Sequence, residues 1–251
     1  MEPATVGLYL GKKVLDQFSK RFAKDVIERW SRRRAINFFG AFVETIGEGK
    51  SEIKVATKLD ELLESDTNQE ILFEAYRMVS LSRSREIGPR AIALMTAKVV
   101  LEGRQFDSLE EIWLRIFETF SDEELIETQD WFVSLLQNLE GNHKGYTRRG
   151  NQLVIEWNKE VSDGIGEVDR TPFNFSDFIG TFAGKLASLD VIAVRVEEKT
   201  ENYKADGEYV DEDGTTRTIT HWLETGINDL EYAKVIDRAN RMVPIKTESL
   251  K

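Results

Sequence analysis

Seven basic residues near the N-terminus are the first whose type and spacing predict a chemistry. They lie within residues 12–34 and are Lys20, Arg21, Lys24, Arg29, Arg32, Arg33 and Arg34. Clustered Lys and Arg predict binding of an anionic partner, either nucleic-acid phosphates or lipid headgroups. Phe18, Phe22 and Trp30 in the same stretch could enter a membrane interface. The competing interpretation is an amphipathic helix with its aromatic stripe in a core and a solvated basic face, and the regular spacing favours it.

A second candidate chemistry is metal-dependent cleavage of a phosphodiester at Glu197 and Lys199. This reaction needs carboxylates for the metal and a nearby lysine that stabilises developing charge. The two residues form Glu-x-Lys after an apolar stretch, and the partner carboxylate would come from Asp169, Asp177 or Asp190. The same short pattern recurs by chance at residues 52–54, so the nuclease is an alternative rather than the leading hypothesis.

Other enzyme classes lack the residues that they need. The chain has no cysteine, which excludes disulfides, thiol catalysis and cysteine-ligated zinc. Its two histidines, His143 and His221, have no recognisable nucleophile at a fixed spacing, so a Ser-His-Asp hydrolase has no support. The sequence therefore predicts no catalytic residue.

Two loop motifs that bind ions or phosphates are incomplete. Residues 211–214 begin like a calcium loop but lack its later oxygen ligands, which favours an acidic hairpin turn. Residues 180–185 have one residue too few between their glycines for a phosphate-binding loop, and Leu186 stands where that loop needs Ser or Thr. We therefore expect Gly180 and Gly184 to allow close helix packing, and we predict no metal and no cofactor.

Charge is unevenly distributed along the chain. With 34 Lys and Arg against 45 Asp and Glu, the formal net charge is −11. Residues 1–50 hold ten basic and six acidic residues, for +4, and the other 201 residues hold 24 and 39, for −15. Overall acidity argues against general nucleic-acid binding. The bipolar layout instead suits assembly with a protein partner or a second copy, through contacts that salt would weaken.

Composition predicts a folded, cytoplasmic protein. Hydrophobic residues make up 41% of the 251 residues, enough for one large core or two small ones. No apolar stretch is long enough to predict a membrane span. The segment from Met1 to Gly11 lacks the charged-then-apolar layout of a signal peptide.

Residues 1–140 are predicted to form a helical domain with a basic N-terminal helix. The apolar stripe of that helix recurs every four residues, at Val14, Phe18, Phe22, Val26 and Trp30. Further helices are expected over residues 51–140, one of them ending at Gly103. Their predicted start signals are Ser65 to Thr67, Pro89, and two capping boxes formed by Ser108 with Glu111 and Ser121 with Glu124.

The last third is predicted to differ in kind. Residues 141–175 read as a linker or long loops, although residues 153–157 fit either a strand or a helix. Residues 176–245 read as a small α+β unit. In it a helix from Ser176 precedes β-prone stretches over 191–196 and 216–223 and a last helix over 228–242.

This order of elements predicts a winged-helix-like unit with a strongly acidic hairpin. DNA phosphates would repel the hairpin, so the unit is expected to bind protein. The acidic residues are Glu197, Glu198, Glu201, Asp206, Glu208, Asp211, Glu212 and Asp213.

The middle and C-terminal parts also carry a family resemblance. Phe120-Ser121-Asp122-Glu123-Glu124-Leu125 lies among the middle helices, and Lys185-Leu186-Ala187-Ser188-Leu189-Asp190-Val191-Ile192 runs from a helix into a strand. In the order of its elements over residues 65–235, the chain resembles bacterial proteins of the Abi-alpha type. The resemblance implies a role in phage resistance.

Together these observations predict a mainly α protein, with a helical N-terminal domain followed by the small α+β unit. The leading hypothesis is a non-enzymatic protein-interaction or regulatory protein in bacterial defence, which acts through a protein partner or as a homo-oligomer. The alternatives are nucleic-acid binding through residues 12–34 and the nuclease at Glu197 and Lys199.

Overall fold

The computed structural model describes residues 32–48, 52–162, 179–203 and 214–242. The chain divides into two compact units, one made of residues 1–129 with 231–251 and the other of residues 130–230. We refer to them as the helical unit and the sheet unit. The division differs from the predicted boundaries at residues 140 and 175, since helices α8 and α11 are each shared between the units.

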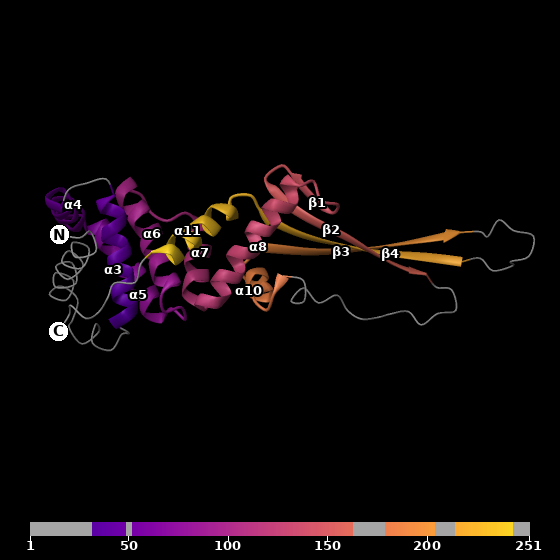
Figure 1. Ribbon diagram of the computed structural model, residues 1–251, viewed down its shortest axis with the longest axis horizontal. Helices are drawn as coiled ribbons and strands as arrows, with labels where there is room; N and C mark the ends of the chain where they lie inside the picture. The colour runs from indigo at the N-terminus through magenta and orange to yellow at the C-terminus, as the bar shows by residue number, and fades with distance from the viewer. Residues whose placement is uncertain (1–31, 49–51, 163–178, 204–213, 243–251) are drawn as a thin grey trace, which may run out of the picture. The chain divides into compact units, whose positions relative to one another are not determined.

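The helical unit is built around one helix that is apolar on nearly every side. Its elements are α3 (Arg32–Gly47), α4 (Glu52–Glu64), α5 (Asp66–Leu81), α6 (Ile87–Glu102), α7 (Ser108–Thr119), the start of α8 (Asp122–Glu140) and most of α11 (Asp229–Arg241). Almost all of α6 from Ile87 to Val100 is buried, and it packs against α3, α5 and α7 (Figure 1). A helix that is apolar all round must be covered on all sides, which is why α6 is central.

Aromatic side chains fill the core around α6. Phe38, Phe39 and Phe42 of α3 are fully buried, as are Trp113 and Phe117 of α7. The mainly α fold predicted from the sequence is confirmed.

Two of the predicted helix starts are confirmed, and one is wrong by one residue. The Ser65 hydroxyl accepts from the Asn68 N–H at the start of α5, and Ser121 and Glu124 form the expected reciprocal pair before α8. The predicted box at Ser108 and Glu111 is wrong by one residue. Asp107 caps α7 instead. Its carboxylate accepts from the Glu110 N–H, and the Glu110 carboxylate accepts from the Asp107 N–H. Helix α6 ends at Gly103, whose φ of 65° is the left-handed conformation typical of a helix stop.

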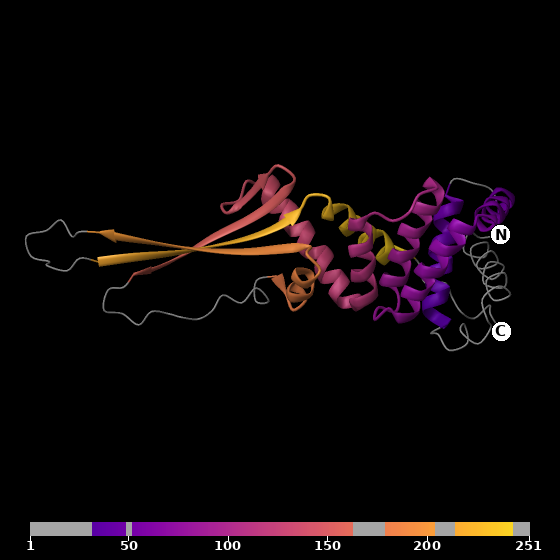
Figure 2. The same cartoon turned by 180° about the vertical axis from the view of Figure 1, so that it is seen from behind.

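The sheet unit holds a four-stranded antiparallel sheet. Its strands are β1 (Tyr146–Arg149), β2 (Gln152–Ser162), β3 (Ile192–Tyr203) and β4 (Gly214–Gly226), in the order β1-β2-β4-β3 (Figures 1 and 2). Helix α10 (Ala183–Ser188) precedes β3. The small β-containing C-terminal part expected from the sequence is therefore present.

Two strands lie in the segment that was predicted to be a linker. Strands β1 and β2 form a hairpin with Gly150 and Asn151 at its turn, and Leu153, Val154 and Ile155 are buried. Gly150 has a φ of 62°. Positive φ at the first turn position fits a two-residue hairpin turn, so Gly-Asn was the turn signal that the sequence reading missed.

The β3–β4 hairpin is confirmed, and its strands are longer than the predicted β-prone stretches at residues 191–196 and 216–223. Gly214 pairs with Tyr203 as the first residue of β4, so Gly214 is not a turn residue, and the connection at 204–213 lies outside the described residues. The order α10, β3, β4, α11 matches the predicted helix, hairpin and helix. The winged-helix interpretation stays a prediction.

The helix predicted from Ser176 is interrupted in its described part. Ser176 lies outside the described residues, Gly180 has a φ of 123° outside the helical region, and α10 begins after it at Ala183. A Cβ on Gly180 would meet the ring of Phe182, and a Cβ on Gly184 would meet nothing within 4 Å. Neither glycine therefore serves close packing between helices. Among the helices that the structure describes, none combines the length and apolar character needed to cross a bilayer.

Candidate functional site

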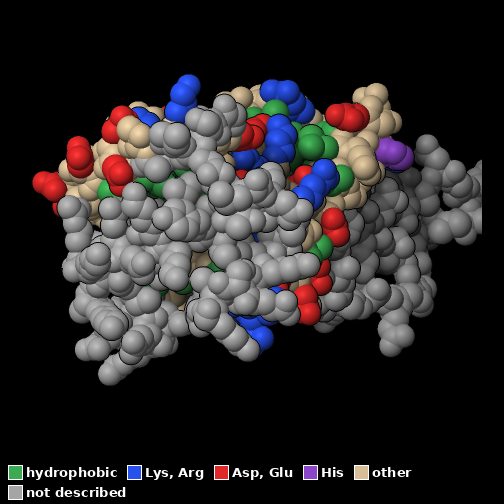
Figure 3. Space-filling model, turned by 60° about the vertical axis from the view of Figure 1, so that its left-hand side comes forward, with side chains coloured by type: hydrophobic (Ala, Val, Ile, Leu, Met, Phe, Trp, Pro, Cys, Tyr) green, Lys and Arg blue, Asp and Glu red, His purple; other side chains and the backbone are tan. Residues whose placement is uncertain are grey.

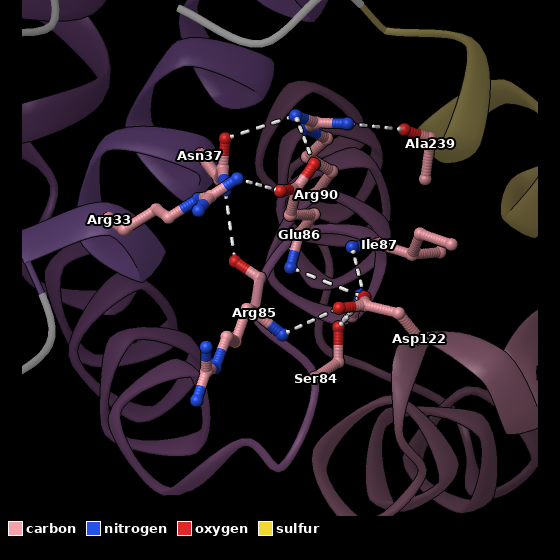
Figure 4. Close-up of polar contacts among 10 residues, drawn as sticks. Arg33, Asn37, Ser84, Arg85, Glu86, Ile87, Arg90, Asp122 and Ala239 are labelled. Carbon is pink, nitrogen blue, oxygen red and sulfur yellow. Dashed lines mark hydrogen bonds and ion pairs between the residues drawn. The ribbon is translucent and has the colours of Figure 1, made fainter. Parts of the chain in front are cut away.

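The most connected polar group of the helical unit surrounds the start of α6. We call Asn37, Ser84, Glu86, Arg90 and Asp122 the polar cluster (Figure 4). They come from α3, the α5–α6 connection, α6 and the first residue of α8. The site is thus assembled from segments far apart in the sequence.

Asp122 is the acceptor at the centre of the cluster. Its carboxylate accepts hydrogen bonds from the Ser84 hydroxyl and from the N–H groups of Arg85 at 3.1 Å, Glu86 at 3.3 Å and Ile87 at 2.8 Å. These N–H groups lie at the N-terminus of α6, where the helix itself has no acceptor for them. Asp122 therefore caps α6 from a different helix and places a negative charge at its positive end.

The environment of Asp122 favours its ionised form. Burial of the carboxylate raises its pKa, but the hydrogen bonds from Ser84, Ile87, Arg85 and Glu86 outweigh that effect, and the net pKa lies below the ordinary value. Asp122 is charged at neutral pH, as a cap requires.

Arg90 is the buried cation of the cluster. Its side chain is only 3% exposed, and its guanidinium donates to the Asn37 Oδ1 at 3.2 Å and to the Ala239 carbonyl at 3.3 Å. Glu86 lies 3.6 Å away as its ion-pair partner. Burial lowers the pKa of Arg90, the negative charges of Glu86 and Asp122 oppose that shift, and Arg33 adds to it. Arg90 thereby ties α6 to α3 and α11.

Of the seven predicted anion-binding residues, two have described side chains, and both make internal contacts. Arg33 pairs with Glu86 in the polar cluster. Arg34 donates to two backbone carbonyls, that of Ser80 at the end of α5 at 3.3 Å and that of Ser84 beyond this helix at 3.1 Å. The backbone of Arg32 begins α3, and its side chain lies outside the described residues, as do Lys20, Arg21, Lys24 and Arg29.

One face of the molecule shows how the described charged side chains are distributed. On the face in Figure 3, the described Lys and Arg side chains lie interspersed with Asp and Glu. Arg33 and Arg34 contact their own chain, and the predicted aromatic stripe at residues 14–30 lies outside the described residues.

A second polar group caps α7. Arg104 forms a two-pronged pair with Glu110, with both N–O distances at 2.6 Å. Burial raises the pKa of Glu110, but the hydrogen bonds from Arg104 and from the Asp107 N–H bring it below its ordinary value. The hydrogen bond to Glu110 is also the main cause of the raised pKa of Arg104. These groups stabilise a helix start.

The strands of the sheet unit carry exposed charges, whereas Asp229 at the start of α11 is buried. Across three strands, Glu156 accepts from Arg149 at 3.2 Å and from the indole N–H of Trp222 at 3.1 Å. Arg195 lies over the Trp222 ring, 5.3 Å from its centroid. Arg149 and Arg195 are both exposed.

The candidate nuclease residues lie on the edge strand β3. Both Glu197 and Lys199 are exposed, and Thr220 and Thr218 stand opposite them on β4. Asp190 has a φ of 59° at the turn before β3, and Asp169 and Asp177 lie outside the described residues. Within the described part of the chain, no three His, Cys, Asp or Glu side chains gather closely enough to hold a metal ion. His221 is buried on β4 and His143 is exposed in a turn, so the two histidines belong to different local environments.

The same edge strand exposes two apolar side chains. Val194 is 37% exposed and Val196 is 54% exposed. They alternate with Arg195 and Glu197, so within residues 194–197 the two valines lie on one face of β3 and the two charged residues on the other. We call residues 194–197 the edge strip. Sequence reasoning identified this strand as β-rich but missed that it lies at the sheet edge, because strand order depends on pairing between distant segments.

Comparisons with protein-family models, with curated proteins and with solved structures each find no match to this chain. The resemblance to Abi-alpha-type proteins therefore stays a prediction.

Proposed function

We propose that this chain is a non-enzymatic protein-interaction or regulatory protein whose partner surface is the edge strip of β3. The observation that carries the proposal is the pair of exposed valines on a strand with only one neighbour among the described strands. An edge strand offers unpaired N–H and C=O groups to an incoming strand, and exposed apolar residues add to the contact.

The charge pattern of β3 supports a protein partner. The basic residues Arg195 and Lys199 lie on either side of the acidic residues Glu197 and Glu198, so the strand is neither uniformly basic nor uniformly acidic. A surface that carries both positive and negative charges can fix the register of a bound protein and discriminate between partners. In the winged-helix interpretation, this strand would belong to the wing. The Abi-alpha resemblance supports a role in bacterial defence for the same interaction.

The test compares matched exposed valines in the sheet unit. In the cells that make the protein, the tagged chain would be cross-linked and purified as wild type, as V194E/V196E and as V133E, since Val133 on α8 is 42% exposed. We expect wild type and V133E to recover the same partner, whether it is another protein or a second copy of this chain. V194E/V196E should lose that partner. Equal recovery by all three chains would contradict the proposal.

Nucleic-acid binding through residues 12–34 remains the alternative, supported by their positive charge. Its test should avoid Arg33 and Arg34, because their internal contacts would confuse lost binding with lost folding. K20E/R21E/K24E should then lower the salt-dependent affinity for labelled duplex DNA, measured by anisotropy. Unchanged affinity would remove this alternative. Running the same samples with magnesium on a denaturing gel tests the nuclease, for which E197Q should stop cleavage.

A further inference from the structure

We infer that the partner of the edge strip is β3 of a second copy of this chain, paired antiparallel about a two-fold axis at Val196. The inference rests on the proposed function, because it assumes that the edge strip is the partner surface. It identifies the occupant and the register, which the proposed function leaves open.

A two-fold axis perpendicular to the sheet continues the sheet from one copy into the other. Each residue then faces a residue of the second copy on the same side of the sheet. With the axis at Val196, Val196 faces itself, and Arg195 faces Glu197. The flanking positions bring Val194 opposite Glu198, Ala193 opposite Lys199 and Ile192 opposite Thr200.

This register places opposite charges together, brings Val196 against Val196 of the second copy and includes Val194 in the paired segment. The symmetry makes every pair occur twice, so there are two facing pairs of Arg195 and Glu197. Oppositely charged residues that face each other across strands stabilise a sheet, and like charges destabilise it.

Neighbouring registers bring like charges together. An axis at Arg195, Glu197, Glu198 or Lys199 places that charged residue against its own copy. An axis at Thr200 avoids like pairs but leaves the edge-strip valines outside the paired segment, and an axis at Val194 pairs a shorter length of β3. Charge, the inclusion of both valines and the paired length together select the axis at Val196.

A single introduced cysteine tests this register directly, because the chain has no cysteine of its own. Facing Cα atoms of paired strands lie about 4.5–5.5 Å apart, within the range that a disulfide spans. On air oxidation, V196C should form a disulfide-linked dimer, seen on a non-reducing gel.

Two cysteine controls distinguish the register from simple exposure. In the inferred dimer, Val194 lies about 13 Å along the strand from its own copy, at the usual rise per residue, so V194C should not cross-link. V133C tests an equally exposed valine on a helix. A V196C dimer that forms no faster than the V194C dimer would overturn the inference.

Charge exchange gives an independent measurement. In each of the two facing pairs, R195E places a glutamate opposite Glu197, E197R places an arginine opposite Arg195, and R195E/E197R restores opposite charges. In sedimentation experiments, each single variant should dissociate at roughly tenfold higher concentration than wild type, and the double variant should recover most of the association. Failure of the double variant to recover would contradict the register.

Self-pairing of β3 and binding through the edge strip have distinguishable negative results. If V196C does not cross-link while V194E/V196E still loses a different protein, the edge strip binds a foreign partner and the self-pairing is wrong. If V194E/V196E also loses nothing, the proposed function falls as well.

Discussion

The two units of the chain use charge in opposite ways. In the helical unit, Arg90, Glu110 and Asp122 are wholly or partly withdrawn from solvent, and each is held by several hydrogen bonds. In the sheet unit, Arg149, Arg195 and Glu197 are exposed. Arg149 pairs with Glu156 of β2, and Arg195 pairs with Glu197 of its own strand and lies over Trp222 of β4. The three charges named in the helical unit therefore stabilise its structure, whereas the three on the sheet remain accessible to a partner.

The largest effect is expected from removing the buried cation of the polar cluster. R90A leaves the Asn37 Oδ1 and the Ala239 carbonyl without their donor and Glu86 without its buried partner. We expect a loss of about 3–4 kcal/mol in the free energy of unfolding, measured by urea denaturation.

The neighbouring Arg85 provides the control, because its side chain is exposed and points away from the cluster in Figure 4. R85A should cost less than about 0.5 kcal/mol. Equal losses for R90A and R85A would show that the cluster does not stabilise the helical unit.

A glycine tests how tightly the segments around the cluster are packed. A Cβ on Gly88 would lie 2.4 Å from the Phe117 carbonyl oxygen and 2.8 Å from the Ser84 Cβ. G88A should therefore force the backbone apart and lower the free energy of unfolding by about 2–3 kcal/mol. In the sheet unit, G184A has open space and should leave stability unchanged or raise it by about 0.5 kcal/mol. A harmless G88A would mean that the approach of α7 to α6 is not tight.

The charge of Asp122 predicts a pH dependence. Because its folded pKa lies below the unfolded value, its contribution is complete above the unfolded pKa of about 4 and is lost as the pH falls through the lower folded pKa. D122N should cost about 2 kcal/mol at neutral pH, and its difference from wild type should shrink in acid. Denaturation at several pH values measures this. E123Q, at the exposed neighbouring residue, should show a small and nearly constant difference, and a constant gap for D122N would contradict the cap.

Much of the fold could be predicted from local signals. Helical periodicity, the Ser121–Glu124 pair and Gly103 act within a few residues, so the sequence shows them directly. The Asp122 cap could not be predicted, because Asp122 is 35 residues after Ile87, whose N–H it accepts, and nothing local joins them.

The candidate site was predictable only in part, for the same reason. In the sequence, Arg33 and Arg34 belong to one basic group. In the folded chain, Arg33 pairs with the Glu86 carboxylate and Arg34 donates to two backbone carbonyls. The edge position of β3 depends on β2 pairing with β4, in which Ile155 faces Leu223 across a long stretch of sequence. Residue types predicted the strands, and the long-range pairing determined which of them faces a partner.

The smallest effect is expected from removing a cation on the sheet, which completes the comparison with Arg90. Arg149 is 55% exposed and pairs with Glu156 at 3.2 Å. Exposed pairs gain little, because water solvates both ions well when they separate, so R149A should cost about 0.5 kcal/mol or less. Glu156 would keep its hydrogen bond from Trp222, so no buried group loses its only partner. Urea denaturation of R149A beside R90A measures the contrast, and a loss near that of R90A would mean that the sheet charges are as structural as those of the helices.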